Sequence, residues 1–86
     1  MDSELEDRWF MRGAFEVNVK LRLVRHRQCL FRIIDEPACA LWVDAEGAPP
    51  PLDELPLMQS RAWAVFYLTE KMVEQLRRMR RERVKL

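Results

Sequence analysis

Basic side chains alternate with apolar ones in the stretch VKLRLVRHRQCLFRII, residues 19–34. A period of two places Lys20 and Arg22 on one side of a strand, and Arg32 joins them if the chain folds back as a hairpin. Trp42 falls on the same even-numbered side of a third strand. Cations contact phosphates and a flat indole stacks on a base, so this set predicts a surface for single-stranded nucleic acid. The alternatives are a solvated face and a site for an acidic protein partner.

A second basic cluster lies near the end of the chain, where residues 77–85, RRMRRERVK, contain six bases and one acid. Bases at a helix C-terminus interact favourably with the helix dipole, but six exceed that need. The cluster is therefore a second candidate for contact with nucleic-acid phosphates, through Arg77, Arg78, Arg81 and Arg83. Alternatively, it pairs with the acidic segment 35–54, which contains no base, in the same chain or in a partner.

Patterns typical of catalysis and metal binding are missing from the sequence. His26, Cys29 and Cys39 offer three metal ligands, whereas a structural zinc site normally has four. Ser3 and Ser60 lie outside any G-x-S-x-G context, and two glycines are too few for a phosphate-binding loop. The sequence therefore predicts a protein that is not an enzyme and that has no cofactor, no metal and no small-molecule substrate.

The composition predicts one folded domain with a heavily charged surface. The chain has 86 residues, of which 49% are hydrophobic and 34% charged, a size at which a single core is only marginally sufficient. No apolar run reaches the roughly 18 to 20 residues that span a bilayer, and the acidic start MDSELEDR is unlike a secretory signal. We expect a soluble intracellular protein, cytoplasmic or, in a eukaryote, nuclear, that does not bind membranes.

The hydrophobic pattern predicts an α+β fold within a single domain, 1–86. Strands are expected at 14–25, 28–34 and 38–43, forming a three-stranded antiparallel meander (βββ). A proline-rich linker, 45–56, leads to one long C-terminal helix, 57–84, which packs on the meander. Ser3 and Glu6 match a capping box, so a short helical turn is possible at 3–11.

Whether a residue number is odd or even, which we call its parity, predicts which side of a strand its side chain occupies and therefore which side chains face the helix. A three-residue loop at 26–28 pairs Leu23 with Phe31 and turns odd-numbered side chains inward. A two-residue turn at His26–Arg27 would instead bury Arg32, and an unpaired buried guanidinium is costly. The first register is preferred, and its further core residues are Phe15, Val17, Val19, Leu21, Ile33, Cys39, Leu41 and Val43.

The predicted helix is apolar around much of its first half, more than a small sheet can cover. Pairing with a second copy is the simplest cover, so the sequence predicts a homodimer. Its interface residues are expected to be Trp63, Phe66, Tyr67, Met72, Leu76 and Met79. In the alternative, Trp9, Phe10 and the proline-rich linker cover the free side.

The order of elements, an antiparallel meander followed by one helix with Trp63 early in it, resembles two families over Phe15–Met79. These are the single-stranded-DNA-binding transcriptional coactivators and the Pur-repeat proteins. The resemblance implies a dimer that binds through a curved sheet face, and an additional strand for which Trp9–Met11 is the candidate. We therefore expect a nucleic-acid-binding or regulatory factor. The alternative is a protein-interaction module, an adaptor or inhibitor subunit that docks through its long helix.

Overall fold

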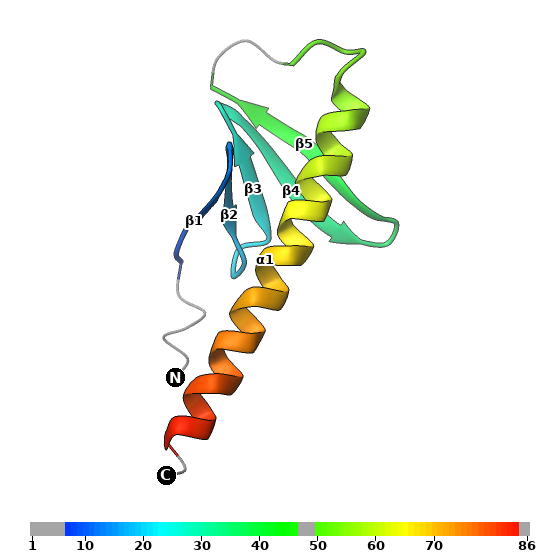
Figure 1. The fold of residues 1–86 in the computed structure, drawn as a ribbon. Helices are drawn as coiled ribbons and strands as arrows, with labels where there is room; N and C mark the ends of the chain where they lie inside the picture. Colours follow the sequence, from blue (N-terminus) through cyan, green and yellow to red (C-terminus); the bar gives the residue numbers. More distant parts are fainter. Residues whose placement is uncertain (1–6, 47–49, 85–86) are drawn as a thin grey trace.

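A computed structural model of the chain describes residues 7–46 and 50–84, and for Ala45 and residues 82–84 it describes the backbone alone. The fold is α+β, as predicted: one antiparallel sheet covered on one face by a long helix (Figure 1). The sheet has five strands in the order β1-β2-β3-β4-β5, so the prediction of three was too low. The strands are β1 (Phe10–Arg12), β2 (Phe15–Asn18), β3 (Leu23–His26), β4 (Cys29–Asp35) and β5 (Ala38–Ala45), and the helix is α1 (Leu55–Val84).

The predicted strand 14–25 is broken into β2 and β3 by a tight turn at residues 19–22. The backbone N–H of Leu21 donates a hydrogen bond to Oδ1 of Asn18, at 2.9 Å. The backbone N–H of Arg22 donates to the Val19 carbonyl at 3.3 Å, and Arg22 has a φ of 58°. Asparagine favours turns because its side chain bonds to the nearby backbone, so Asn18 provides the local reason for the break.

The strand β1 replaces part of the predicted helical turn 3–11. Phe10–Arg12 pairs with β2 across a two-residue connection, Gly13-Ala14. Gly13 has a φ of 63°, and glycine in the first central position is typical of the tight hairpin turn that joins antiparallel strands. The prediction is therefore wrong for Phe10 and Met11, while residues 3–6 of that turn lie outside the described residues.

Neither predicted register of the β3–β4 hairpin is correct. The turn residues are Arg27 and Gln28, His26 pairs with Cys29, and Val24 pairs with Phe31. The break at 19–22 changes the parity, so Val24 rather than Leu23 faces the helix. Leu21 lies in the turn and is exposed.

The parity prediction also fails in β5 but holds in β4. Phe31 and Ile33 of β4 are buried as predicted, and they pair with Trp42 and Ala40. Ala38, Ala40 and Trp42 of β5 therefore face the helix, and a shift in register after Trp42 turns Asp44, the partner of Leu30, to the other face. As a result Leu41 and Val43, predicted to be in the core, are each 43% exposed. The main core cluster comprises Val17, Val24, Cys29, Phe31, Ile33, Ala40, Ala62 and Phe66.

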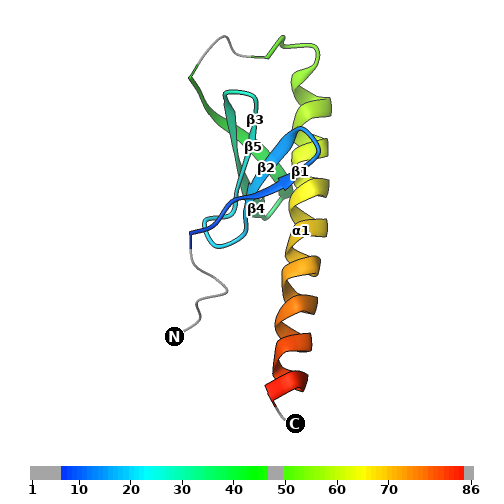
Figure 2. The same cartoon turned by 60° about the vertical axis from the view of Figure 1, so that its left-hand side comes forward.

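The helix α1 has 30 residues and is therefore about 45 Å long. It begins two residues before the predicted start, at Leu55, and the carbonyl of Glu54 accepts a hydrogen bond from Met58. Four residues with helical spacing are buried on its sheet-facing side: Ala62, Phe66, Thr69 and Val73. The C-terminal half extends beyond the sheet (Figure 2). Within the described ranges, no helix is long and apolar enough to cross a membrane.

Candidate basic site and helix surfaces

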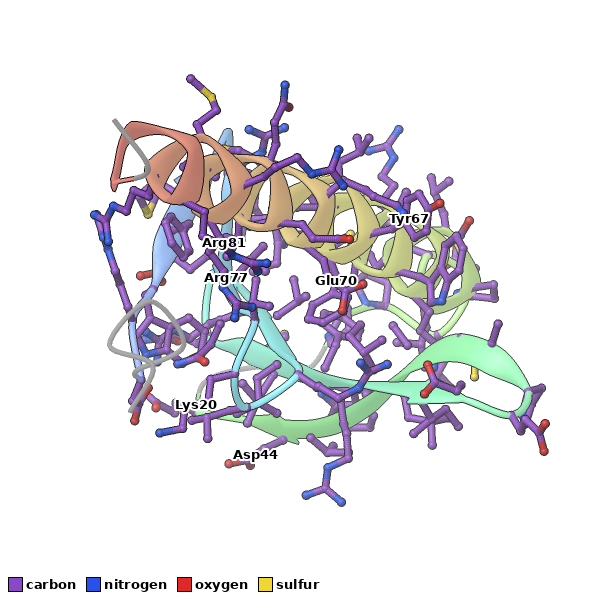
Figure 3. All side chains as sticks on the ribbon, turned by 90° about the horizontal axis from the view of Figure 1, so that it is seen from below. Lys20, Asp44, Tyr67, Glu70, Arg77 and Arg81 are labelled. Atoms are coloured by element: carbon purple, nitrogen blue, oxygen red, sulfur yellow. The ribbon has the colours of Figure 1, made fainter. Side chains whose placement is uncertain are left out.

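Four of the predicted nucleic-acid-binding cations meet at one cleft between the 19–22 turn and α1. Lys20 and Arg22 come from the turn, and Arg77 and Arg81 from the helix. We call this the turn–helix cleft; its volume is about 610 Å³ and its remaining lining residues are Val19, Glu70, Val73 and Glu74. Glu70, Arg77 and Arg81 project from α1 on the side of the sheet (Figure 3).

The Arg22 side chain connects the turn to the helix and to the end of β4. Its Nη2 lies 2.6 Å from Oδ1 of Asp35, and its Nη1 lies 3.9 Å from Oε2 of Glu70. The guanidinium carbon is 5.1 Å from the centre of the Phe66 ring. Arg22 therefore faces the helix, not the opposite face of the sheet as predicted, and its charge is balanced by carboxylates of the protein.

The cleft as a whole favours an anion, because four cations and only two carboxylates, Glu70 and Glu74, line it. Lys20 is exposed, and Arg77 and Arg81 follow one another along the same side of α1. Of these two carboxylates, Glu70 lies near Arg22, as described above, and Glu74 is the other. An arginine presents several N–H donors that match the oxygens of a phosphate or a carboxylate.

The other residues predicted for nucleic-acid binding lie elsewhere. Arg32 pairs with Leu23 and Leu41 and is exposed on the sheet face away from α1. Trp42 pairs with Phe31, so its register places it on the helix-facing side. The predicted sheet face that combines an indole with Lys20, Arg22 and Arg32 is therefore not assembled.

Two predicted residues belong to the end of α1. Arg78 is exposed but follows Arg77 by one position, which turns it about 100° around the helix. Arg83 lies in the last turn of α1, and its side chain is outside the described residues.

The face of the sheet away from α1 is partly covered by the N-terminal segment. Arg25 and Glu16 form an ion pair there, with Nε and Oε1 3.0 Å apart. The Arg25 guanidinium also lies over the Trp9 ring, 4.4 Å from its centre. Trp9 therefore covers the outer face of the sheet, and the alternative in which it covers the free side of the helix is wrong.

The predicted interface residues of the helix are divided among three sides. Phe66 is 3% exposed and belongs to the core of its own chain, so it is wrongly predicted as an interface residue. Trp63 packs against that core and stacks on Tyr67, with ring centres 5.6 Å apart. On another side, Met72 receives a contact from Nη1 of Arg12 at 3.7 Å. Leu76 and Met79 are exposed.

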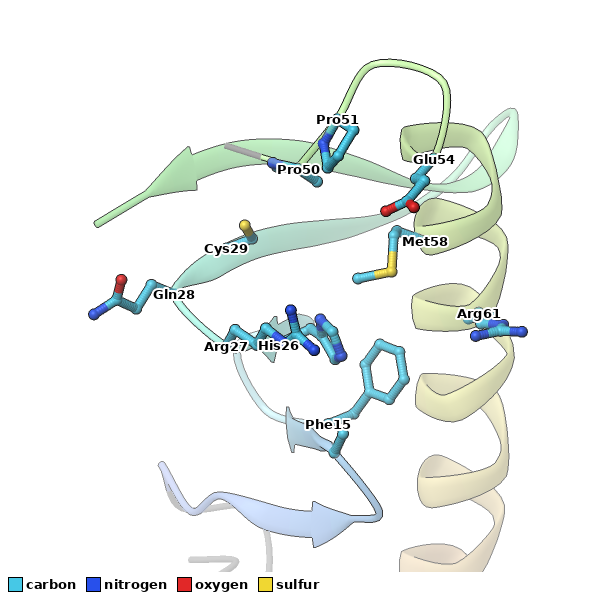
Figure 4. A pocket seen from close by; sticks show the side chains of 11 residues that line it. Phe15, His26, Arg27, Gln28, Cys29, Pro50, Pro51, Glu54, Met58 and Arg61 are labelled. Atoms are coloured by element: carbon cyan, nitrogen blue, oxygen red, sulfur yellow. The ribbon is translucent and has the colours of Figure 1, made fainter. Parts of the chain in front are cut away.

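A second hollow, of about 630 Å³, lies between the Arg27–Gln28 turn and the start of α1. His26 lines it, and its ring lies 4.6 Å from that of Phe15 (Figure 4). Burial lowers the pKa of His26 below its ordinary value of 6.5, and the nearby charges of Arg27 and Arg61 lower it further. The fold therefore favours the neutral form of His26. The sequence alone does not indicate this hollow, because Phe15 and His26 are brought together only by the pairing of β2 with β3, which the hydrophobic pattern did not predict.

Comparisons with protein-family models, with curated proteins and with solved structures found no match. Among residues 7–46 and 50–84, no three histidine, cysteine, aspartate or glutamate side chains are grouped so as to hold a metal ion. Cys29 and Cys39 are both free thiols.

Proposed function

We propose that this chain is a small non-enzymatic binding protein that contacts nucleic-acid phosphates through the turn–helix cleft. The observation that supports the proposal is the convergence of Lys20, Arg77 and Arg81 from two distant segments on one cleft. Arg78 and Arg80, which are both exposed, lie on the same stretch of α1.

The geometry favours contact with the phosphate backbone over recognition of bases. Trp42, the predicted stacking residue, is on β5 and does not line the cleft. Phosphate contacts give affinity without sequence specificity. The proposed binding is therefore largely independent of nucleotide sequence and depends strongly on salt.

A salt titration tests this function. The binding constant for a fluorescent single-stranded oligonucleotide is measured by anisotropy between low and moderate salt, for the wild type and two double variants. Lys20→Ala/Arg81→Ala removes two cleft cations, and we expect the slope of log K against log salt to fall by about two.

The matched control, Lys71→Ala/Arg32→Ala, removes the same net charge from exposed positions away from the cleft. It should leave the slope close to that of the wild type. Equal losses in both variants, or no binding by the wild type at low salt, would contradict the proposal.

A second candidate function is recognition of an extended peptide from a protein partner, and the observation that favours it is the edge of β5. A hollow of about 310 Å³ lies between that edge and the start of α1. Its lining is uncharged: Ala38, Cys39, Ala40, Leu41, Pro56, Gln59, Ser60 and Trp63. A peptide strand with neutral side chains would add to the sheet here through main-chain hydrogen bonds.

Peptide display tests the second candidate. Random peptides are selected on the wild type, with a Ser60→Trp variant, whose indole fills the hollow, as counter-selection. Enrichment of neutral, β-branched sequences on the wild type alone is the expected result. Equal enrichment on both proteins would contradict binding at this edge.

A further inference from the structure

A continuous row of residues with spacings of three and four runs along α1, between the edge of the helix next to β1 and its solvent-facing side. We call this row the back seam; it comprises Leu57, Arg61, Ala64, Leu68, Met72, Gln75 and Met79. Leu57, Leu68 and Met79 are 53%, 55% and 55% exposed, respectively. The seam borders β1 on one side: Met72 is half-buried and contacts Arg12, and Leu68 lines a shallow hollow with Met11 and Gly13. Leu57, Leu68 and Met79 nevertheless remain more than half exposed, so the protein's own sheet leaves these side chains uncovered.

We propose that the back seam binds a second copy of the chain, with the two helices antiparallel and Leu68 on the two-fold axis. The seam is complementary to itself in this arrangement. Leu68 meets the partner's Leu68, and Leu57 meets the partner's Met79. The small Ala64 faces the partner's Met72, and Arg61 faces the partner's Gln75, so a polar residue is always opposite a polar one.

Charge favours the antiparallel orientation. The basic end of α1, residues 77–84, then lies beside the start of the partner's helix, where Asp53 and Glu54 precede Leu55. A parallel pair would place two arginine-rich ends side by side, and like charges repel. The helix dipoles are also opposed only in the antiparallel pair. One contact would account for both the acidic and the basic segments of the sequence.

The extent of the seam suits a stable dimer. With Leu68 on the axis, residues 55–81 of the two helices lie side by side, a contact about 40 Å long. Because the core of a chain of this size is only marginally sufficient, burial of apolar surface between two copies would add to the stability of both. The turn–helix cleft is on the sheet side of α1, so the dimer leaves two such clefts accessible, and this inference does not depend on the proposed function.

The oligomeric state tests the seam. We expect the wild-type chain to have the mass of a dimer by light scattering coupled to size exclusion at about 100 μM, a concentration well above a micromolar Kd. Leu68→Glu opposes two carboxylates on the axis and should raise the dissociation constant at least about a hundredfold.

The matched control is Tyr67→Glu. Tyr67 has a similar exposure, 45% against 55% for Leu68, but is turned about 100° away around the helix. It should remain dimeric, and circular dichroism should show unchanged helicity in both variants. A monomeric wild type, or a dimeric Leu68→Glu variant, would overturn the inference.

Cysteine cross-linking tests the orientation, in a Cys39→Ser background because Cys29 is buried. Leu68→Cys should form an intermolecular disulfide under mild oxidation. Leu57→Cys and Met79→Cys should cross-link when both are present and not singly. Cross-linking of Leu57→Cys to its own counterpart would indicate parallel helices and overturn the proposed arrangement.

Discussion

The two sides of α1 carry similar apolar residues at similar spacing but have different surroundings. On the sheet side, Phe66 is 3% exposed and packs with Ala62 among the strands. On the back, Leu68 is 55% exposed although it is two residues away. The difference in exposure arises because the sheet covers only one side of the helix, and not because the residue types differ. The sheet side stabilises the fold of the single chain, whereas Leu68 on the other side remains exposed to solvent.

The largest expected effect is that of Phe66→Ala, compared with Leu68→Ala on the back. Loss of a buried phenyl ring should lower the free energy of unfolding by about 3–5 kcal/mol, because it leaves a cavity under the helix. Leu68→Ala should cost no more than about 0.5 kcal/mol in dilute solution. Urea titrations followed by circular dichroism at low protein concentration measure both. Similar losses would show that the two sides are not different after all.

Asn18→Ala tests whether the 19–22 turn stabilises the packing of the sheet against α1. Asn18 is fully buried; its Nδ2 donates to Asp7 and its Oδ1 accepts from Leu21. Removing the amide should cost about 1–3 kcal/mol in unfolding free energy, since buried partners lose their hydrogen bonds. The control is Gln28→Ala in the exposed hairpin turn, which should unfold at nearly the wild-type urea concentration.

Arg22→Ala should cost about 1 kcal/mol, because Arg22 and its partner Asp35 are both partly exposed to solvent and screened. Arg32→Ala, on the other face of the sheet, should have almost no effect on thermal unfolding. If the two variants melt together, the contacts of Arg22 with Asp35, Glu70 and Phe66 do not help to hold α1 on the sheet.

The smallest effect concerns pH. The pKa of His26 is lowered in the folded state by burial and by Arg27 and Arg61, so folding favours its neutral form. Its contribution is fully present above pH 6.5 and is lost as the pH falls through the lowered pKa, because the unfolded chain binds the proton first. Glu54 lines the same hollow. Urea midpoints of the wild type and His26→Gln between pH 7.5 and 5 should converge as the pH falls; parallel curves would exclude this contribution.

Part of the candidate site could be predicted from the sequence. The prediction named Lys20, Arg77 and Arg81 as ligand-binding cations, and all three line the turn–helix cleft. It did not bring them together, because it assigned Lys20 to the middle of a strand and the arginines to a distant helix end. Their proximity depends on the turn at 19–22 and on the angle at which α1 crosses the sheet.

The local periodicity of apolar residues was sufficient to predict β4 and α1. Alternation identified Phe31 and Ile33 as core residues, and the 3.6-residue period identified the long helix, since both periods follow from backbone geometry within one element. Only the tertiary structure decided how the elements combine. The hydrogen bond from Leu21 to Asn18 breaks the first predicted strand and shifts the parity of the next. The alternation of inward and outward side chains within a strand cannot be continued across a turn, so the partners of Arg22 and the side on which Trp42 lies could not be predicted. The exposure of Leu68 on α1 likewise depended on how far the sheet extends, which is set by contacts between segments far apart in the chain.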